Sequence, residues 1–210
     1  DILDYRKVTK LKGTYTDGLI KVADVNNRVH TNFKQTGTAT GRLSSSEPNL
    51  QNIPVRTELG RKFRRFFVPK NENYVLIDAD YSQIELRLLA HISGDRNMID
   101  AFLSGEDIHT MTAAKVFGVA PDAVTSDLRK KAKAVNFGIL YGIGEYSLSE
   151  DLGISRAQAK EYIDSYFAQF GEIRSYLDRV REEAKRDGFV TTFFGRRRYI
   201  PELASSNKNL

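Results

Sequence analysis

The chain has 210 residues, of which 40% are hydrophobic and 10% aromatic, so it has the length and composition of a folded protein rather than a disordered tail. It contains no cysteine, which excludes disulfide bonds and thiolate metal sites and fits a reducing cytoplasm. No apolar run approaches the roughly 20 residues that a membrane-spanning helix needs, so we expect no membrane partner.

Basic residues outnumber acidic ones by 32 to 27, which gives a formal net charge of +5. Many of them gather in three clusters, residues 61–67, 129–133 and 196–199, and aromatic residues lie inside or beside each cluster. A single cluster is as readily a solvated surface as a binding site. Three clusters interleaved with aromatics favour a nucleic acid partner, because each neutralised phosphate releases counterions.

The first 54 residues predict a helix, a hairpin and a long loop. Residues 2–12 have a helical pattern that stops at a glycine. Residues 19–25 and 28–33 alternate between apolar and polar positions around two asparagines, which predicts a hairpin. Residues 35–54 are rich in Thr, Ser, Gly, Asn and Pro, and loops of this length in compact domains are often functional.

The rest of the chain predicts a strand, a block of helices and a return to β structure. Residues 74–80 form an apolar run that predicts a buried strand. The period then becomes helical, and we expect helices over 83–93, 97–103, 108–117, 127–141, 155–170 and 172–187. Two short strands, 189–194 and 197–200, follow. This order predicts an α+β fold, with a helical subdomain inserted into a sheet-based one.

Asp80 is the first candidate for chemistry, because it comes at the end of the apolar run and before a helix. A carboxylate in that position suits Mg²⁺, which takes one or two carboxylates together with water and phosphate oxygens. The backbone carbonyl of Tyr81 can supply another oxygen. Asp78 is a rival ligand on the same side of the strand, and Asp80 can also serve only as a helix cap.

The helix predicted over residues 127–141 carries Arg129, Lys133, Phe137 and Tyr141 at intervals of four. Each step of four residues turns about 40°, so the four side chains form one slowly winding stripe. Its basic end suits a triphosphate, and its aromatic end suits a sugar and a base. A half-buried helix with a basic outer edge explains the same pattern. The apolar residues predicted to face the core are Ala132, Val135, Ile139 and Leu140.

The loop segment 40–54 carries amides, hydroxyls and one arginine. Such groups can contact sugars, phosphates and the acceptors of the minor groove. The same composition is also that of an ordinary loop, so the segment alone does not decide between the two.

Taken together, these segments resemble the family A DNA polymerases. Residues 80–87, DYSQIELR, match the family's motif A, and residues 129–142 keep the R-x3-K-x3-F-x3-Y-G spacing of motif B. Residues 40–54 match the TGRLSS…PNLQNIP segment, and residues 107–110 and 194–201 match two further segments. The resemblance covers essentially the whole chain in the family's order.

The resemblance implies a partial right-hand polymerase fold with a small antiparallel palm sheet and an inserted, mostly helical fingers subdomain. The thumb base and first part of the palm then span residues 1–90, the fingers 91–190, and a return towards the palm 191–210. It also implies Mg²⁺ as cofactor, and primer-template DNA and deoxynucleoside triphosphates as partners. A monomer in the cytoplasm, associated with the nucleoid, is expected.

For the catalytic residues, the resemblance implies that Asp80 ligates the catalytic Mg²⁺ ions with help from the Tyr81 carbonyl. It implies that Arg129 and His109 hold the β- and γ-phosphates. Lys133 then neutralises the α-phosphate or protonates the leaving pyrophosphate.

For the sugar, base and DNA, the resemblance implies a further set of contacts. Gln83 binds the nucleotide, and Glu85 lies beside the sugar C2′ and rejects ribonucleotides, with Tyr141 as its neighbour. Phe137 stacks on the incoming nucleotide. The residues implied to contact primer-template DNA are Arg42, Asn49, Asn52 and Arg196.

The sequence departs from the family's pattern in one respect. The second metal-binding aspartate of the family lies in a His-Asp-Glu motif, and this tripeptide does not occur here. We therefore expect the chain to be part of a longer polymerase and to be inactive by itself, since a two-metal mechanism needs more than one anchoring carboxylate.

Three alternatives to a DNA polymerase were weighed. A nucleic-acid-binding module without catalysis accounts for the basic clusters but not for the spacing of motifs A and B. A metal-dependent nuclease needs a larger acidic cluster than Asp78, Asp80 and Glu85 provide. A phage or organellar RNA polymerase-like protein is disfavoured by Glu85, the expected sugar gate.

Overall fold

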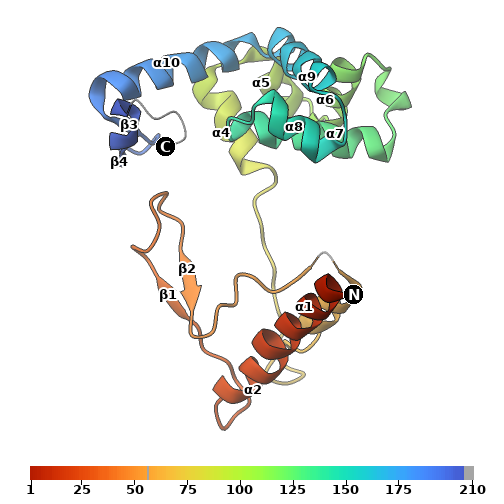
Figure 1. Ribbon diagram of the computed structural model, residues 1–210, viewed down its shortest axis with the longest axis vertical. Helices are drawn as coiled ribbons and strands as arrows, with labels where there is room; N and C mark the ends of the chain where they lie inside the picture. Colours follow the sequence, from red (N-terminus) through yellow and green to blue (C-terminus); the bar gives the residue numbers. More distant parts are fainter. Residues whose placement is uncertain (56, 206–210) are drawn as a thin grey trace. The chain divides into compact units, whose positions relative to one another are not determined.

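The computed structural model describes residues 1–55 and 57–205 and divides into two compact units, Asp1–Ala79 and Asp80–Leu210 (Figure 1). Neither unit contains a described helix long and apolar enough to cross a membrane. Each unit has its own helices and its own short hairpin.

Unit 1 combines helices with one short hairpin. Its elements are α1 (Ile2–Leu11), a π-helical segment (Lys12–Asp17), α2 (Gly18–Val22), β1 (Asn32–Lys34), β2 (Ser44–Ser46) and α3 (Glu58–Arg64). β1 pairs antiparallel with β2, with Phe33 opposite Ser45.

Two predictions for unit 1 are wrong. The first helix does not end at Gly13, because the π-helical segment carries the helical backbone on to Val22. The hairpin predicted over residues 19–33 is also wrong, because most of its first predicted strand belongs to the helix α2. The π segment brings Tyr15 inward, where it packs against Phe63 at a ring-centroid distance of 6.1 Å and is buried. A buried aromatic contact therefore outweighs the local alternating pattern.

The loop predicted over residues 35–54 contains β2 and is held by hydroxyl groups. The Thr31 hydroxyl donates to the Pro48 carbonyl at 2.8 Å, and the buried Ser45 hydroxyl accepts from the Leu50 backbone N–H at 2.9 Å. These bonds satisfy backbone groups that the irregular segment leaves unpaired.

The buried strand predicted over residues 74–80 is also wrong. The segment is neither helix nor strand, and Val75 and Ile77 are 77% and 84% exposed. A strand needs a neighbour for its backbone groups. Among the described residues β1 pairs with β2 and β3 with β4, and neither pair includes this segment.

Unit 2 is a helical bundle with a hairpin near its end. Its elements are α4 (Ile84–Ser93), α5 (Arg96–Leu103), α6 (Ile108–Phe117), a 3₁₀ turn (Pro121–Ala123), α7 (Ser126–Leu140), α8 (Glu145–Leu152), α9 (Arg156–Gln169), α10 (Gly171–Asp187), β3 (Phe189–Thr191), β4 (Arg197–Tyr199) and a second 3₁₀ turn (Pro201–Ala204). β3 and β4 are antiparallel, and α10 leads directly into them (Figure 1).

Local capping explains why these helices begin where the sequence predicts. The side chains of Asp95, Asp107, Thr125 and Ser155 each accept a backbone N–H at the start of α5, α6, α7 and α9. Such caps satisfy N–H groups that have no partner within the helix. α3 and α8 were not predicted.

The core of unit 2 lies where α4 to α10 meet. Tyr166 of α9, Leu148 of α8, Met98 of α5, Ile173 of α10 and Phe170, which lies between α9 and α10, are completely buried there. Ala132, Val135 and Ile139 of α7 are buried as predicted, and Leu140 packs against them. The helical bundle with two small antiparallel sheets, one in each unit, confirms the α+β prediction.

Candidate active site

A hollow of about 430 Å³ in unit 2 brings together most of the predicted site residues, and this volume lies in the roughly 300–1,000 Å³ range of small-molecule sites. One part of its wall comes from the segment leading into α4, and the other from α6 and α7. The lining residues are Asp80, Tyr81, Gln83, Ile84, Glu85, His109, Arg129, Lys133 and Phe137.

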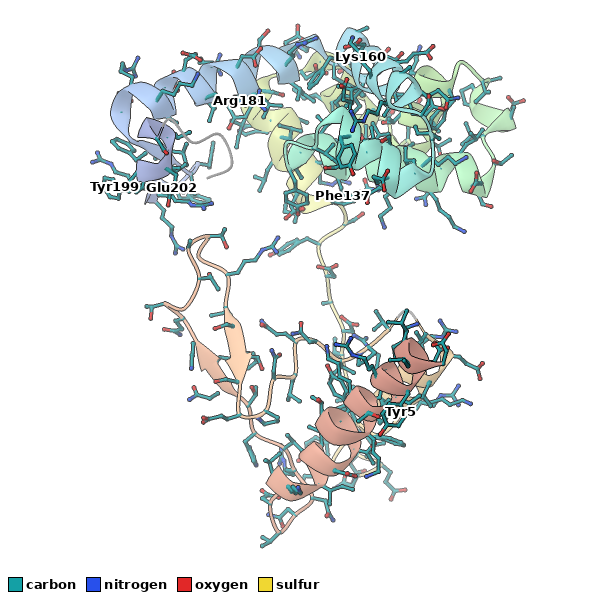
Figure 2. The ribbon with its side chains drawn as sticks, in the orientation of Figure 1. Tyr5, Phe137, Lys160, Arg181, Tyr199 and Glu202 are labelled. Atoms are coloured by element: carbon teal, nitrogen blue, oxygen red, sulfur yellow. The ribbon has the colours of Figure 1, made fainter. Side chains whose placement is uncertain are left out.

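The stripe predicted on α7 is present. Arg129, Lys133 and Phe137 all line the hollow, and the Lys133 Nζ lies 5.9 Å from the centre of the Phe137 ring. The Phe137 ring stacks with that of Tyr141 at 6.5 Å and 19°. Figure 2 shows the half-buried Phe137 side chain at the edge of the helical bundle, and Tyr141 is exposed. The hollow therefore has a cationic end and an aromatic end.

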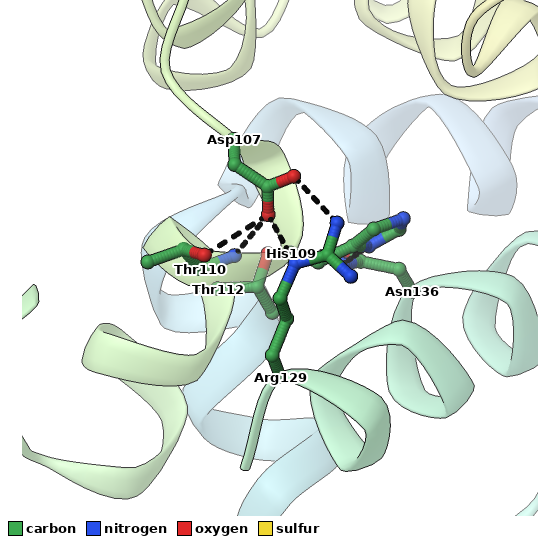
Figure 3. A network of polar contacts seen from close by, with 6 residues as sticks. All are labelled: Asp107, His109, Thr110, Thr112, Arg129 and Asn136. Carbon is green, nitrogen blue, oxygen red and sulfur yellow. Dashed lines mark hydrogen bonds and ion pairs between the residues drawn. The ribbon is translucent and has the colours of Figure 1, made fainter. Parts of the chain in front are cut away.

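Arg129 is held by the acidic cap of the neighbouring helix. The Asp107 carboxylate accepts the Thr110 backbone N–H at 2.8 Å, and Arg129 donates to its two oxygens at 3.1 and 2.7 Å (Figure 3). The guanidinium lowers the pKa of Asp107 to about 2, and the carboxylate in turn raises the pKa of Arg129. This two-point ion pair fixes the guanidinium beside the hollow.

His109 lies next to this pair and is only 2% exposed. Its Nδ1 is 3.0 Å from the Nδ2 of Asn136, and its ring is tilted against Phe137 at 6.0 Å. Burial lowers the pKa of His109, Asp107 raises it, and the cations of Arg129 and Lys133 lower it again. Burial outweighs the carboxylate, so His109 is neutral at pH 7.

The motif A side of the hollow carries the carboxylates. Gln83, the residue before α4, has φ 54° and ψ 37°, a left-handed backbone conformation that residues other than glycine rarely adopt. Glu85 follows in the first turn and accepts a hydrogen bond from the Tyr141 hydroxyl at 2.7 Å. This bond ties α4 to the aromatic end of α7.

The oxygen donors on this wall fit Mg²⁺ in their chemistry. Asp80 offers an exposed carboxylate, and Tyr81 adds a backbone carbonyl. Among the described residues there is no group of three His, Cys, Asp or Glu side chains placed to hold a metal ion. Since Mg²⁺ is commonly held by one or two carboxylates plus substrate phosphate and water, the site suits an ion that arrives with a phosphate ligand.

The residues implied to contact DNA are exposed in both units. Arg42, Asn49 and Asn52 lie in unit 1 on the 40–54 loop, where Asn49 Oδ1 accepts the Gln51 backbone N–H at 2.9 Å. The Asn52 carbonyl accepts from the Tyr15 hydroxyl. Arg196 lies in unit 2 on the turn between β3 and β4, and its backbone N–H donates to the Thr192 hydroxyl at 3.1 Å.

Sequence reasoning missed three residues of this site: Asp107, Thr112 and Asn136. Asp107 gave a signal, because an aspartate just before an apolar-periodic run is a helix cap. Asn136 gave a weaker one, as a polar residue between the core positions Val135 and Ile139. Thr112 gave none.

The comparison with protein families identifies the class. The profile of the family described as DNA polymerase family A matches residues 1–210. The chain therefore belongs to the family A DNA polymerases, as motifs A and B indicated.

Within that family, the chain is similar to bacterial DNA polymerase I. It is 55% identical over 210 residues to DNA polymerase I of Bacillus subtilis (strain 168), covering 100% of this chain and 24% of that protein. With DNA polymerase I of Caldicellulosiruptor bescii it is 54% identical over 210 residues, covering 100% and 25%. The chain thus spans about a quarter of the length of these relatives.

A solved structure has the same fold. This is the POL domain of Pol1 from M. smegmatis in complex with DNA primer-template and dNTP. It matches with a TM-score of 0.89 and 48% identity, over 99% of this chain and 36% of that one.

The ion pair at the site gives a testable pH dependence. Replacing Arg129 with Ala should raise the pKa of Asp107 from about 2 towards the ordinary value near 3.9, because the guanidinium is the main cause of its depression. NMR titration of the carboxyl carbon in the chain measures this. A Lys130→Ala variant, which removes a charge from the next position, should leave the pKa low.

The lowered pKa of Asp107 also affects the stability of the fold in acid. A carboxyl with a lowered folded-state pKa stabilises the fold above its unfolded pKa, so this contribution is lost as the pH falls from about 4 through 2. The stability difference between wild type and Arg129→Ala should shrink over that window. An Asp107 pKa that does not respond to Arg129→Ala would contradict the assignment.

Proposed function

We propose that the protein containing this chain is a template-directed DNA polymerase, which transfers a nucleotidyl group from a deoxynucleoside triphosphate to a primer 3′ end. The observation that carries the proposal is the single hollow that joins the motif A carboxylates to the motif B cations and aromatics. The relatives named DNA polymerase I and the solved domain in complex with primer-template and dNTP support it.

The phosphates of the nucleotide fit the cationic end of the hollow. Arg129 and His109 bind the β- and γ-phosphates, and Lys133 faces the α-phosphate. When the primer 3′ hydroxyl loses its proton to water and its oxygen bonds to the α-phosphorus, the bond to the bridging oxygen breaks and pyrophosphate leaves. Lys133 neutralises the α-phosphate or protonates the leaving pyrophosphate. Such positioned charges are the main protein contribution to phosphoryl transfer.

Asp80, with the carbonyl of Tyr81, is the proposed anchor for Mg²⁺. In a two-metal mechanism Mg²⁺ held there would supply charge stabilisation for the oxygens that react. Asp80 needs neither burial nor a protein partner for this role. Its carboxylate would itself be a ligand of the ion, and water would surround the rest of the group.

The sugar and base of the nucleotide fit the aromatic end. Phe137 stacks on the nucleotide, and Gln83, on the part of the wall that leads into α4, also binds it. Glu85, fixed by its hydrogen bond from Tyr141, lies beside the sugar C2′. A carboxylate there rejects a 2′-hydroxyl by its bulk and its negative charge, which accounts for selection of deoxynucleotides.

The remaining parts of the proposal are the DNA contacts and the subdomains of the chain. Arg42, Asn49, Asn52 and Arg196 contact the primer-template. Residues 1–90 form the thumb base and the first part of the palm, residues 91–190 form the fingers, and residues 191–210 return towards the palm. The protein acts as a monomer with the bacterial chromosome in the cytoplasm. We expect the 210 residues alone to bind DNA in a salt-sensitive manner, because the basic clusters contact phosphates. We expect them not to extend a primer, because they contain no His-Asp-Glu motif.

The role of Asp80 is tested in the longer protein by primer extension. Asp80→Ala should lower nucleotide incorporation by on the order of 10³-fold or more, while primer-template binding persists, because a metal ligand is lost and no packing is disturbed. Asp78→Ala is the matched control and should extend nearly normally. If the two variants behave in the opposite way, Asp78 is the ligand and the proposed site is wrong.

The positioned cation on α7 is tested by two neighbouring lysines. Lys133→Ala should lower kcat by on the order of 10²-fold, because Lys133 lines the hollow. Lys130 lies about 100° from Arg129 around the helix and does not line the hollow, so Lys130→Ala should cost less than about threefold. Single-turnover incorporation measures both variants. Equal losses would mean that general positive charge, rather than a positioned group, supports the reaction.

A further inference from the structure

Asn136 occupies an unusual place for an amide. It lies inside α7, between the core residues Val135 and Ile139, and it is completely buried. Asparagine is unfavourable in a helix interior, and burying an amide without partners is costly. The structure supplies partners on the neighbouring helix: the completely buried Thr112 and the nearly buried His109, both on α6.

The bonds of Asn136 determine which nitrogen of His109 carries a proton. The Asn136 Nδ2 lies 3.0 Å from His109 Nδ1, and an amide NH₂ group can only donate (Figure 3). His109 Nδ1 therefore accepts and carries no hydrogen. A neutral imidazole with a bare Nδ1 has its hydrogen on Nε2. Because His109 also lines the hollow, Nε2 is the nitrogen left for a ligand.

Thr112 anchors this amide. Its hydroxyl donates to Asn136 Oδ1 at 3.2 Å, and its oxygen accepts from Nδ2 at 3.1 Å. The other contact of Nδ2 is His109 Nδ1, so the amide joins the threonine and the histidine of α6 in one buried network. A reversed amide would place its oxygen on His109 Nδ1 and favour a hydrogen there, which is the alternative that the tautomer measurement below excludes or reveals.

We propose that Asn136, anchored by Thr112, is a positioning residue that holds His109 as the neutral imidazole with its hydrogen on Nε2, and so presents one uncharged N–H donor to a phosphate in the hollow. The phosphate part rests on the proposed function. The tautomer does not, because it follows from the hydrogen bonds within unit 2 alone.

The charges that face His109 agree with a neutral ring. α6 contributes Asp107, whose carboxylate is already paired with Arg129, and α7 contributes Arg129 and Lys133. The wall leading into α4 adds Asp80 and Glu85 to the same hollow. Two nearby cations and burial oppose protonation of the ring. A bound triphosphate would favour protonation, and the donor from Asn136 opposes it, because the added proton would have to go to Nδ1.

The tautomer is measured directly by NMR of the 210-residue chain labelled with ¹⁵N in its histidine rings. There are only three histidines, and His109→Gln assigns the signal of interest. Wild-type His109 should show a bare Nδ1 and a protonated Nε2 from pH 6 to 8. A hydrogen on Nδ1, or a doubly protonated ring at pH 7, would overturn the proposal without any reference to polymerase activity.

Two variants separate positioning from general stability. Asn136→Asp replaces the donor with a carboxylate, so the hydrogen should move to Nδ1 and the protonation midpoint of His109 should rise by more than about one pH unit. Ser149→Ala also changes a buried polar side chain of unit 2, whose hydroxyl bonds to Tyr146, and should leave the His109 signals unchanged. A shift as large in Ser149→Ala would show that general loosening, not the Asn136 bond, sets the tautomer.

The consequence for phosphate binding is measured in the longer protein. Asn136→Ala should raise KM for deoxynucleoside triphosphate by about tenfold, with a smaller change in kcat and unchanged primer-template affinity. A KM equal to wild type, together with the expected tautomer, would overturn the role of His109 in phosphate binding and leave its tautomer assignment standing.

Discussion

The packing of α6 against α7 is the interaction on which the site depends. The two helices are in contact, and Ile108 of α6 and Val135 of α7 are completely buried in the same apolar cluster. Two polar links lie on the same interface, Asp107 with Arg129 and His109 with Asn136. A slip of one helical turn would break both, so the apolar contact also sets the position of the cations.

The hollow places opposite charges on two walls that belong to different elements. Carboxylates come from the segment that enters α4, and cations come from α7. The Tyr141 hydroxyl donates to the Glu85 carboxylate at 2.7 Å and so links the end of α7 to α4. Arg129 is already paired with Asp107, so an anionic ligand shares the guanidinium with an existing partner and does not have to order a free side chain.

The helices could be predicted because their signals are local. Asp95, Asp107, Thr125 and Ser155 each mark a helix start in the sequence, and each caps that helix in the structure. The stripe of four side chains on α7 follows from the helical period alone. The α+β fold class, the Asp80 carboxylate and the α7 stripe were therefore accessible from the chain itself, whereas Gln83, Glu85 and His109 came from the family resemblance.

The errors lie where the structure depends on distant partners. The segment 74–80 has the composition of a buried strand, but its backbone has no strand beside it among the described residues. The hairpin expected over 19–33 gave way to a helix because Tyr15 finds Phe63 nearly fifty residues away. Asn136 was missed for the same reason, since its role depends on side chains of another helix.

Whether the hollow in unit 2 binds the triphosphate of a nucleotide can be measured by a titration of the 210-residue chain. A deoxynucleoside triphosphate is added with Mg²⁺ while the backbone amide signals are followed by NMR. We expect the perturbed amides to map to residues 80–85, 107–110 and 129–141, and Lys133→Ala to weaken the response by about tenfold or more. Perturbations confined to the basic clusters at 61–65 and 196–198, with none around the hollow, would contradict the account.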